Sequence, residues 1–361
     1  MSEFPDMRAR DREGLSKIFR YYAQVETPRM DSPVYTAYSF GVADEPEILD
    51  LCAQIDGKQP APNVLYAAVQ DLLMQDARST AEARALTHFY PAIGGDPIPE
   101  RSPWEAFRAF CLANADRLGP SLREGRTQTC VVHRCTSILP ALASLPSVGE
   151  AKGRVALLEI GPSAGLNLRF DRYAYDYGGG IVWGEADAKP VLHCEIRGEV
   201  RPPMPSELEI VARRGLDLNP IDLADPKSLR WLRALIWPEH AERARVMNEA
   251  LALATSVPIE IEAGDATRDL GAAIAKLPDD CARVLFATQV FYQIPQEGRM
   301  KILEAMARAS RDASLDFVLM ESTGEGDSRI EWFGFANGEN TNRTTLARAD
   351  SHGRWIEWGA A

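Results

Sequence analysis

The spacing of apolar positions divides the chain near residue 150. Before that point, apolar positions recur at intervals of three and four residues, which is typical of helices packed on one face. One such face combines Val64, Leu65, Ala68, Val69, Leu72 and Leu73, with Asn63 as the expected cap. A second helix is expected to start at Ser102 and to stop at Gly119-Pro120. Residues 1–150 are therefore predicted to form a helical N-terminal domain.

After residue 150 the pattern changes to short apolar runs separated by helical segments. The run 155–160 is nearly all apolar, as a strand buried on both faces should be. Further strands are predicted at 208–211, 258–261, 284–287, 315–320, 330–335 and 354–358. Alternating strands and helices favour a parallel sheet, whereas the Asn337-Gly338 turn makes the last two strands antiparallel. The predicted fold of residues 151–361 is α/β, with a Rossmann-like, seven-stranded, mostly parallel sheet and an antiparallel C-terminal edge.

Composition and charge narrow the classes of function. The chain has 361 residues and a formal net charge of −12. A protein this acidic lacks the basic face that releases counterions from a phosphate backbone, so neither nucleic acid nor an anionic membrane is an expected partner. No run reaches the ~18 apolar residues of a membrane span, and Met1 to Arg12 has no apolar stretch of a secretory signal. We expect a cytoplasmic protein with a small-molecule substrate, and the oligomeric state stays open.

The cysteines do not indicate a disulfide framework or a metal site. The six cysteines include no Cys-x-x-Cys pair, as expected for a reduced protein. Cys130, His133 and Cys135 lie close in sequence, but no fourth ligand completes the tetrahedral set that zinc prefers. No metal is therefore predicted.

The turn after the first predicted strand carries the candidate chemistry. It reads Glu159-Ile160-Gly161-Pro162-Ser163-Ala164-Gly165. A dinucleotide-binding turn fits it least well, because Ser163 stands where the second glycine would be. The turn also matches the Gly-x-Ser-x-Gly pattern of serine hydrolases, with His352 as the candidate base. Helices rather than strands precede it, however, so an α/β-hydrolase-type esterase using Ser163 is kept as an alternative.

The same turn resembles the first loop of S-adenosylmethionine-dependent methyltransferases. In that fold an acidic residue ends the first strand, and glycines let the backbone approach the cofactor. Two later strand ends resemble the fold in the same order, so that Asp217 would accept the ribose hydroxyls and Asp265 would take the adenine amino group. The residues that the resemblance implies for S-adenosylmethionine are Glu159, Gly161, Ser163, Gly165, Asp217, Asn219, Gly264, Asp265 and Ala266.

One spacing departs from the simplest form of that fold. Gly165 and Asp217 are 52 positions apart, whereas about 20 residues are usual. The extra chain between Tyr173 and Pro205 indicates an inserted hairpin, which makes Asp176 an alternative ribose ligand. Asp217 itself has a second interpretation, as an Asx turn before Pro220.

Four polar residues are candidates for the substrate side: Arg134, Asn167, Gln289 and Tyr292. Methyl transfer from a sulfonium mainly requires that the nucleophile is oriented and water is excluded. We expect the N-terminal helices to supply a lid for this purpose. No general base can be named, so a protein that binds the nucleoside without chemistry is the other alternative.

Three runs of residues also resemble a family of uncharacterised bacterial proteins that is known only as a domain of unknown function. The runs are Leu158 to Tyr173, Arg213 to Pro220 and Leu232 to Glu239. The resemblance extends from about Trp104 to the last predicted strand. It implies a methyltransferase-like core and names no substrate.

Overall fold

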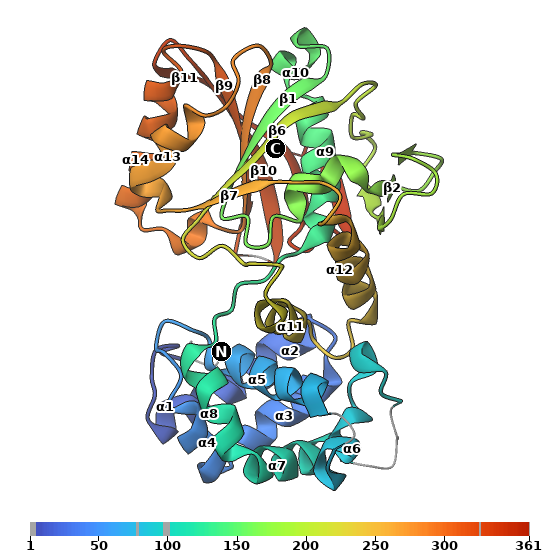
Figure 1. Cartoon of the computed structure of the whole chain (residues 1–361), viewed down its shortest axis with the longest axis vertical. Helices are drawn as coiled ribbons and strands as arrows, with labels where there is room; N and C mark the ends of the chain where they lie inside the picture. Colours follow the sequence, from blue (N-terminus) through green and yellow to red (C-terminus); the bar gives the residue numbers. More distant parts are fainter. Residues whose placement is uncertain (1–4, 77–78, 97–101, 325, 361) are drawn as a thin grey trace. The chain divides into compact units, whose positions relative to one another are not determined.

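The computed structural model describes residues 5–76, 79–96, 102–324 and 326–360. The chain forms two compact units (Figure 1). One unit comprises Met1–Thr129 and Asp222–Arg245, and the other comprises Cys130–Ile221 and Val246–Ala361. The predicted domain boundary near residue 150 is not tested by this division and stays a prediction.

The first unit is helical over its described residues. Its helices are α1 (Arg12–Tyr21), α2 (Thr27–Arg29), α3 (Pro33–Ala43), α4 (Pro46–Cys52), α5 (Ala61–Asp76), α6 (Ala81–Thr87), α7 (Pro103–Ala113), α8 (Ala115–Glu124) and α11 (Pro226–Ala234), and α12 (Ala241–Leu253) begins in it. A π-helical turn (Tyr22–Glu26) and a 3₁₀ turn (Pro91–Ile93) complete it. The helical prediction for the N-terminal part is therefore confirmed for these residues.

Two local signals for helix ends were wrong. The helix α5 begins at Ala61, so the expected cap Asn63 lies inside it. The Ser102 cap is confirmed, since its Oγ accepts the Glu105 N–H at 3.5 Å. The helix that it starts ends at Ala113, because Asn114 leaves the helical conformation and its side-chain amide donates to the Phe110 carbonyl at 2.9 Å. The expected stop at Gly119-Pro120 lies inside α8 instead.

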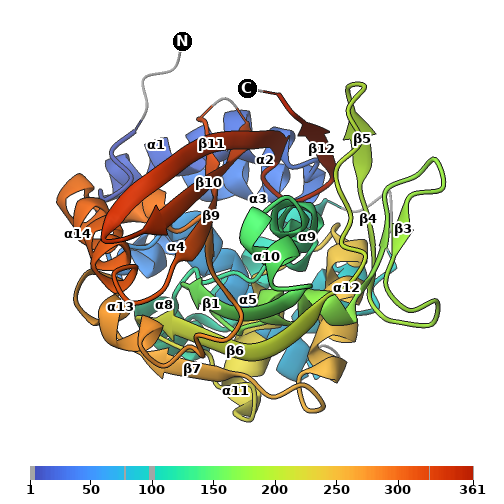
Figure 2. The same ribbon diagram turned by 90° about the horizontal axis from the view of Figure 1, so that it is seen from above.

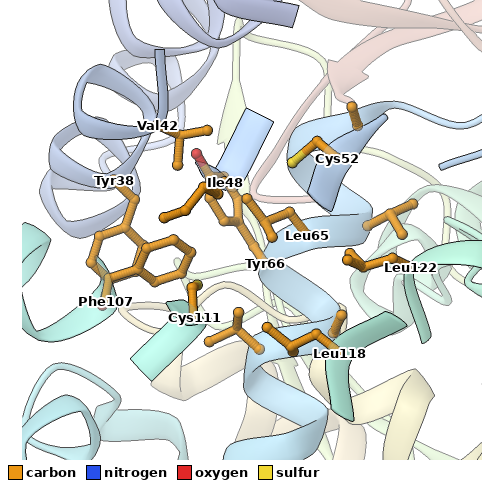
Figure 3. Packing of buried hydrophobic residues seen from close by; sticks show 14 of the residues in the cluster. Tyr38, Val42, Ile48, Cys52, Leu65, Tyr66, Phe107, Cys111, Leu118 and Leu122 are labelled. Carbon is orange, nitrogen blue, oxygen red and sulfur yellow. The ribbon is translucent and has the colours of Figure 1, made fainter. Parts of the chain in front are cut away.

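Aromatic side chains fill the core of the helical unit. Tyr38 of α3 stacks on Phe107 of α7 with ring centroids 4.1 Å apart, and Tyr66 of α5 lies beside this pair (Figure 3). The segment 222–245 joins the same unit through α11, which lies along α5 (Figure 1). An ion pair between Arg230 and Asp71, 2.7 Å long, fixes that contact.

The second unit is built on a nine-stranded sheet. Its strands are β1 (Arg154–Ile160), β5 (Glu195–Arg197), β6 (Glu209–Asp217), β7 (Glu260–Ala263), β8 (Ala282–Thr288), β9 (Leu315–Ser322), β10 (Asp327–Ala336), β11 (Glu339–Asp350) and β12 (Trp355–Trp358). They follow the order β5-β12-β11-β10-β9-β8-β1-β6-β7. The five strands β7, β6, β1, β8 and β9 are parallel to one another. The strand β10 is antiparallel to β9 and β11, β12 is antiparallel to β11, and β5 runs parallel to β12 at the edge.

Helices cover both faces of this sheet (Figure 2). α9 (Cys135–Ala143) and α10 (Pro146–Glu150) lie on one face, and α13 (Ala266–Ile274) and α14 (Gln296–Ala309) lie on the other (Figure 2). The strand β1 runs through the middle of the parallel part, where Leu157 pairs with Arg213 of β6 and Val284 of β8. The alternate residues Leu158 and Phe317 belong to the core under α13 and α14. The prediction of a large, mostly parallel sheet with helices is therefore confirmed.

The sheet has nine strands rather than the seven predicted. One additional strand is β11, whose run of polar residues carries no apolar strand signal. The other is β5, a three-residue strand from the inserted segment. The rest of that segment forms a separate sheet of β2 (Ala174–Asp176), β3 (Val182–Trp183) and β4 (Val191–His193).

The segment after the glycine turn is a short 3₁₀ helix, η4 (Asn167–Arg172). Two side chains donate hydrogen bonds to carbonyl groups around this short helix. The Arg169 guanidinium donates to the carbonyls of Gly165, Ala254 and Val257, each at 3.0 Å. Tyr173 Oη donates to the Leu166 carbonyl at 2.7 Å. These bonds satisfy carbonyl groups next to the short helix.

Across the described residues, no helix combines the length and the apolar character that crossing a membrane requires.

Candidate functional site

The turn that leaves β1 is held in a left-handed conformation at three positions. Gly161, Ser163 and Gly165 have φ angles of 71°, 56° and 66°. Glycine adopts such angles at little cost, whereas a serine adopts them only when its surroundings hold it there. Ser163 is therefore the strained member of the turn, and its neighbours must stabilise it.

Backbone N–H groups of this turn donate hydrogen bonds to other groups of the protein. Gly161 N donates to the Leu216 carbonyl at 2.9 Å, and Gly165 N donates to the Pro162 carbonyl at 2.8 Å. Ser163 N donates to Asp217 Oδ2 at 2.8 Å. Within this described stretch the turn thus offers no ring of open N–H groups, which is what a phosphate-binding loop requires.

Side chains from neighbouring segments fill the space beside the two glycines. A Cβ on Gly165 would lie 2.1 Å from Ile259 Cδ1, and a Cβ on Gly161 would lie 2.7 Å from Val290 Cγ2. A Cβ at either glycine would therefore force a neighbouring side chain to move. This constraint had not been predicted, because Ile259 and Val290 are distant in sequence.

Asp217 ends β6 and joins it to the turn. Its Oδ2 accepts the Ser163 N–H, and its Oδ1 accepts the Asn219 N–H, both at 2.8 Å. The second bond is the Asx turn that was weighed for this residue. Next to Asp217, Leu218 is a strongly exposed large apolar side chain, 69% accessible.

The end of β7 lies beside the end of β6. Gly264 N donates to the Asp217 carbonyl at 2.9 Å. Asp265 caps α13, because its Oδ1 accepts the Thr267 N–H at 2.9 Å, and Ala266 is the first residue of that helix. The structure therefore brings the three predicted strand ends together, at the carboxyl ends of β1, β6 and β7.

Glu159, the penultimate residue of β1, is a buried acid. Its side chain is 1% exposed. Asn167 Nδ2 donates to its Oε1 at 3.4 Å, while its Oε2 has no hydrogen-bond partner. Burial raises the pKa of Glu159 to about 8, against the lowering effect of the Asn167 hydrogen bond. This carboxyl group is therefore mainly protonated at pH 7.

Asn167 and two thiols complete the surroundings of Glu159. Cys135 Sγ, from the start of α9, donates to Asn167 Oδ1 at 3.5 Å. Cys130 lies against the turn, and burial raises the pKa of its thiol to about 12. Both thiols are neutral at pH 7, and over the described residues no group of His, Cys, Asp and Glu side chains could hold a metal ion.

Arg134 and Gln289 meet the ends of β8 and β11. Arg134, in the 3₁₀ turn η3 (Val132–Arg134), donates from Nε to the Ser351 carbonyl at 3.0 Å and from Nη1 to the Thr288 carbonyl at 3.3 Å. Gln289 Nε2 donates to Ser328 Oγ at 2.7 Å, and Ser328 Oγ lies 2.9 Å from Ser351 Oγ. Both candidate substrate residues thus belong to one polar network at this edge of the sheet.

Glu321 was missed by the sequence interpretation. It stands near the end of β9, and its carboxylate accepts three successive backbone N–H groups of the loop after β8. Val290 N and Phe291 N donate to its Oε1 at 2.6 and 2.8 Å, and Tyr292 N donates to its Oε2 at 3.1 Å. The sequence does contain a signal for Glu321, which is an acidic residue that follows an apolar run, as Asp217 is.

The remaining candidates lie differently. Tyr292 is 62% exposed at the end of this loop. Asp176 lies in β2 of the small sheet, where its Oδ1 accepts the Gly178 N–H at 2.8 Å. The Ser163 hydroxyl is buried and has no hydrogen-bond partner, so no histidine contacts it as a base would. The geometry therefore offers the serine-esterase alternative no support.

Two surface grooves lie away from these strand ends. A groove of about 900 Å³ runs along the first residues of β6 and the end of α12, between Arg172 and Pro258. A second, of about 620 Å³, lies by the small sheet and includes Asp176 and His193.

Comparison with known proteins gives one match. A family model described as uncharacterised protein conserved in bacteria (DUF2332) matches residues 16–358. No curated protein and no solved structure matches the chain.

Proposed function

Because the chain belongs to this family of uncharacterised bacterial proteins, we propose from its own site that it is an S-adenosylmethionine-dependent methyltransferase acting on a small molecule. The observation that carries the proposal is the strand order β7-β6-β1-β8-β9 with all five strands parallel. The order of strands along the chain reverses direction between β1 and β8. In open α/β sheets, ligands bind outside the carboxyl ends of the strands at such a point.

The acceptor groups at these strand ends fit a nucleoside. Asp217 and Asp265 end neighbouring strands, and carboxylates are suited to accept hydroxyl and amino hydrogens. A carboxylate has the capacity for about four hydrogen bonds, so Asp217 can hold the turn and also accept ribose hydroxyls. The exposed Leu218 side chain would cover the apolar face of a base. Two buried polar atoms without partners, Glu159 Oε2 and Ser163 Oγ, add hydrogen-bonding capacity at the turn.

The groups at these strand ends also disfavour a dinucleotide. The N–H groups of Gly161, Ser163 and Gly165 are bonded within the protein, and the nearest acidic groups would repel a pyrophosphate. S-adenosylmethionine carries no phosphate. The Rossmann-like interpretation of the parallel strands is part of this proposal.

The bound cofactor would supply an electrophilic methyl group. The work of the chain is to orient the acceptor against it and to exclude water. Arg134, Asn167, Gln289 and Tyr292 would stand on the acceptor side, with Gln289 held by Ser328 and Tyr292 by Glu321. None of the described side chains is assigned as a general base.

Calorimetric titration with S-adenosylmethionine and S-adenosylhomocysteine tests the proposal, with NADH as a negative control. We expect saturable binding of the first two ligands and none of NADH. Asp217→Asn should weaken binding at least tenfold, while Asp222→Asn, which changes an exposed carboxylate close by in sequence, should leave it unchanged. Failure of both sulfur nucleosides to bind would overturn the proposal.

Binding without turnover would favour the alternative of a nucleoside-binding protein that performs no chemistry. The assay that separates the two is release of S-adenosylhomocysteine in the presence of small-molecule acceptors. We expect release that depends on the acceptor.

A further inference from the structure

Arg134 is a cation with an unusual set of partners. It is half-buried, and burial lowers the pKa of its guanidinium from the ordinary value. Its hydrogen bonds go to two backbone carbonyls, those of Ser351 and Thr288. Over the described residues, no acidic side chain lies within the 4.0 Å ion-pair distance of its guanidinium. A buried cation normally has such a partner.

Two other arginines of the same unit have more protein partners than Arg134 has. Arg213 forms a two-pronged ion pair with Asp171, at 2.5 and 2.7 Å. Arg169 donates to three carbonyls. Arg134 uses two of its five N–H donors in this way.

The Nη2 group of Arg134 is not fully buried. In the described part of the chain, several buried side-chain atoms have no hydrogen-bond partner, and no nitrogen of Arg134 is among them. Its Nη2 group is therefore without a protein acceptor but not sealed in the interior.

The charge around Arg134 is also low. The groups that act on it electrostatically are Cys130, Tyr292, Glu321 and Glu159. Burial raises the pKa values of the Cys130 thiol and of the Glu159 carboxyl group, so both are mainly neutral at pH 7. The Glu321 carboxylate is already held by three backbone N–H groups.

We propose that the Arg134 guanidinium binds a carboxylate group of the ligand at this site. A guanidinium fork matches a carboxylate in a planar, two-bonded geometry. The proposal rests on the proposed function for the identity of the ligand, and two sources carry the group: the methionyl part of S-adenosylmethionine, and a methyl acceptor that is a carboxylic acid.

A comparison of two cofactors distinguishes the sources without any mutation. If the methionyl carboxylate is bound, the wild-type protein should bind S-adenosylmethionine at least about tenfold more tightly than its decarboxylated analogue. Arg134→Met should then lower the affinity for S-adenosylmethionine to that of the analogue and leave the analogue unaffected. Arg134→Lys, which keeps the charge but not the fork, should fall between them.

If the two cofactors bind equally, the carboxylate belongs to the acceptor. Benzoate and succinate, titrated into the complex with S-adenosylhomocysteine, should then bind to the wild-type protein and to Arg172→Met. That control removes an exposed arginine from η4, 57% accessible in its side chain. Binding should be lost in Arg134→Met.

The pH profile adds a readout that a purely structural role would not move. Glu159 is hydrogen-bonded to Asn167 and is close enough to Asp217, Arg134 and the thiols of Cys130 and Cys135 to interact with them electrostatically, and it becomes charged as pH rises through about 8. Carboxylate affinity should therefore fall between pH 7 and pH 9, and Glu159→Gln should abolish that fall.

The outcomes remain separable from those of the proposed function. If neither sulfur nucleoside binds, that function fails, and shifts of the Arg134 side-chain N–H resonances on addition of benzoate still test the carboxylate site. The proposal is overturned if Arg134→Met leaves the preference for S-adenosylmethionine over its analogue intact. It is equally overturned if the cofactors bind equally and no carboxylate binds, or if benzoate leaves the Arg134 resonances unmoved in a protein that binds neither nucleoside.

Discussion

The Asp217 carboxylate accepts the Ser163 N–H at 2.8 Å and so ties the end of β6 to the turn that leaves β1. Ser163 has a φ angle of 56°, which a residue other than glycine adopts at a cost in free energy. The carboxylate therefore stabilises the strained point of the turn. Asp217 therefore has a structural role that does not depend on cofactor binding.

Asp217→Ala should loosen this turn. The buried Ser163 N–H loses its acceptor, which costs about 1–3 kcal/mol. Asp217→Asn retains one carbonyl acceptor and should cost less. Hydrogen exchange measured by mass spectrometry on peptides that cover residues 161–166 checks both variants. Unchanged exchange in Asp217→Ala would show that other contacts suffice.

Glu321 should order the loop after β8 in a similar way. Glu321→Ala leaves the N–H groups of Val290, Phe291 and Tyr292 without their acceptor. We expect faster amide exchange in residues 289–294 and a loss of about 1–3 kcal/mol. Glu321→Gln should recover part of the loss. Glu304→Gln, an exposed change on α14, is the control and should leave exchange in this loop unaltered.

The strands of the parallel sheet could be predicted because of where they lie. β1, β8 and β9 are buried on both faces, so each is a nearly continuous apolar run that the sequence displays directly. β11 could not be predicted, since many of its side chains are polar and exposed. The 3₁₀ helix η4 was also beyond prediction, because Arg169 holds it through carbonyls of residues 254 and 257.

For the candidate site, the residues at the strand ends could be predicted from the sequence, whereas their partners could not. Strand ends bring Glu159, Asp217 and Asp265 together by topology, so an ordered set of apolar runs is enough to find them. The partners of these residues depend on contacts between distant segments, as in the bond of Arg134 to the Ser351 carbonyl. No local pattern contains that information.

Glu159 should make stability depend on pH. Its pKa is about 8 in the folded chain because of burial, against an ordinary value of 4.5. Between these values the folded state keeps a proton that the unfolded state releases. The free energy of unfolding should therefore fall as pH rises from about 4.5 to about 8, by at most about 1.4 kcal/mol per pH unit.

Urea unfolding of the wild-type protein and of Glu159→Gln over this range measures the effect. The variant cannot ionise, so its stability should depend less steeply on pH. Glu297→Gln, an exposed residue of α14, should follow the wild-type slope. Parallel slopes for the wild-type protein and Glu159→Gln would contradict the raised pKa.

Two glycines with similar backbone angles should tolerate alanine differently. Gly165 and Gly178 have φ angles of 66° and 72°, so alanine should meet about 1–2 kcal/mol of backbone strain at either position. A Cβ on Gly178 meets no atom within 4 Å, whereas a Cβ on Gly165 meets Ile259 Cδ1 at 2.1 Å. Gly165→Ala should therefore cost about 1–3 kcal/mol more than Gly178→Ala, because it overpacks the turn against β7.

A second substitution isolates that packing cost. Ile259→Val removes the Cδ1 atom that the new methyl group would meet, so the double variant Gly165→Ala with Ile259→Val should regain part of the lost stability. Urea unfolding of the two single variants and the double variant gives the coupling free energy. A favourable coupling of about 1 kcal/mol or more is expected. Strictly additive effects would mean that the contact with Ile259 Cδ1 contributes nothing to the cost at Gly165, and that backbone strain and the contact with Ile261 Cδ1 account for it.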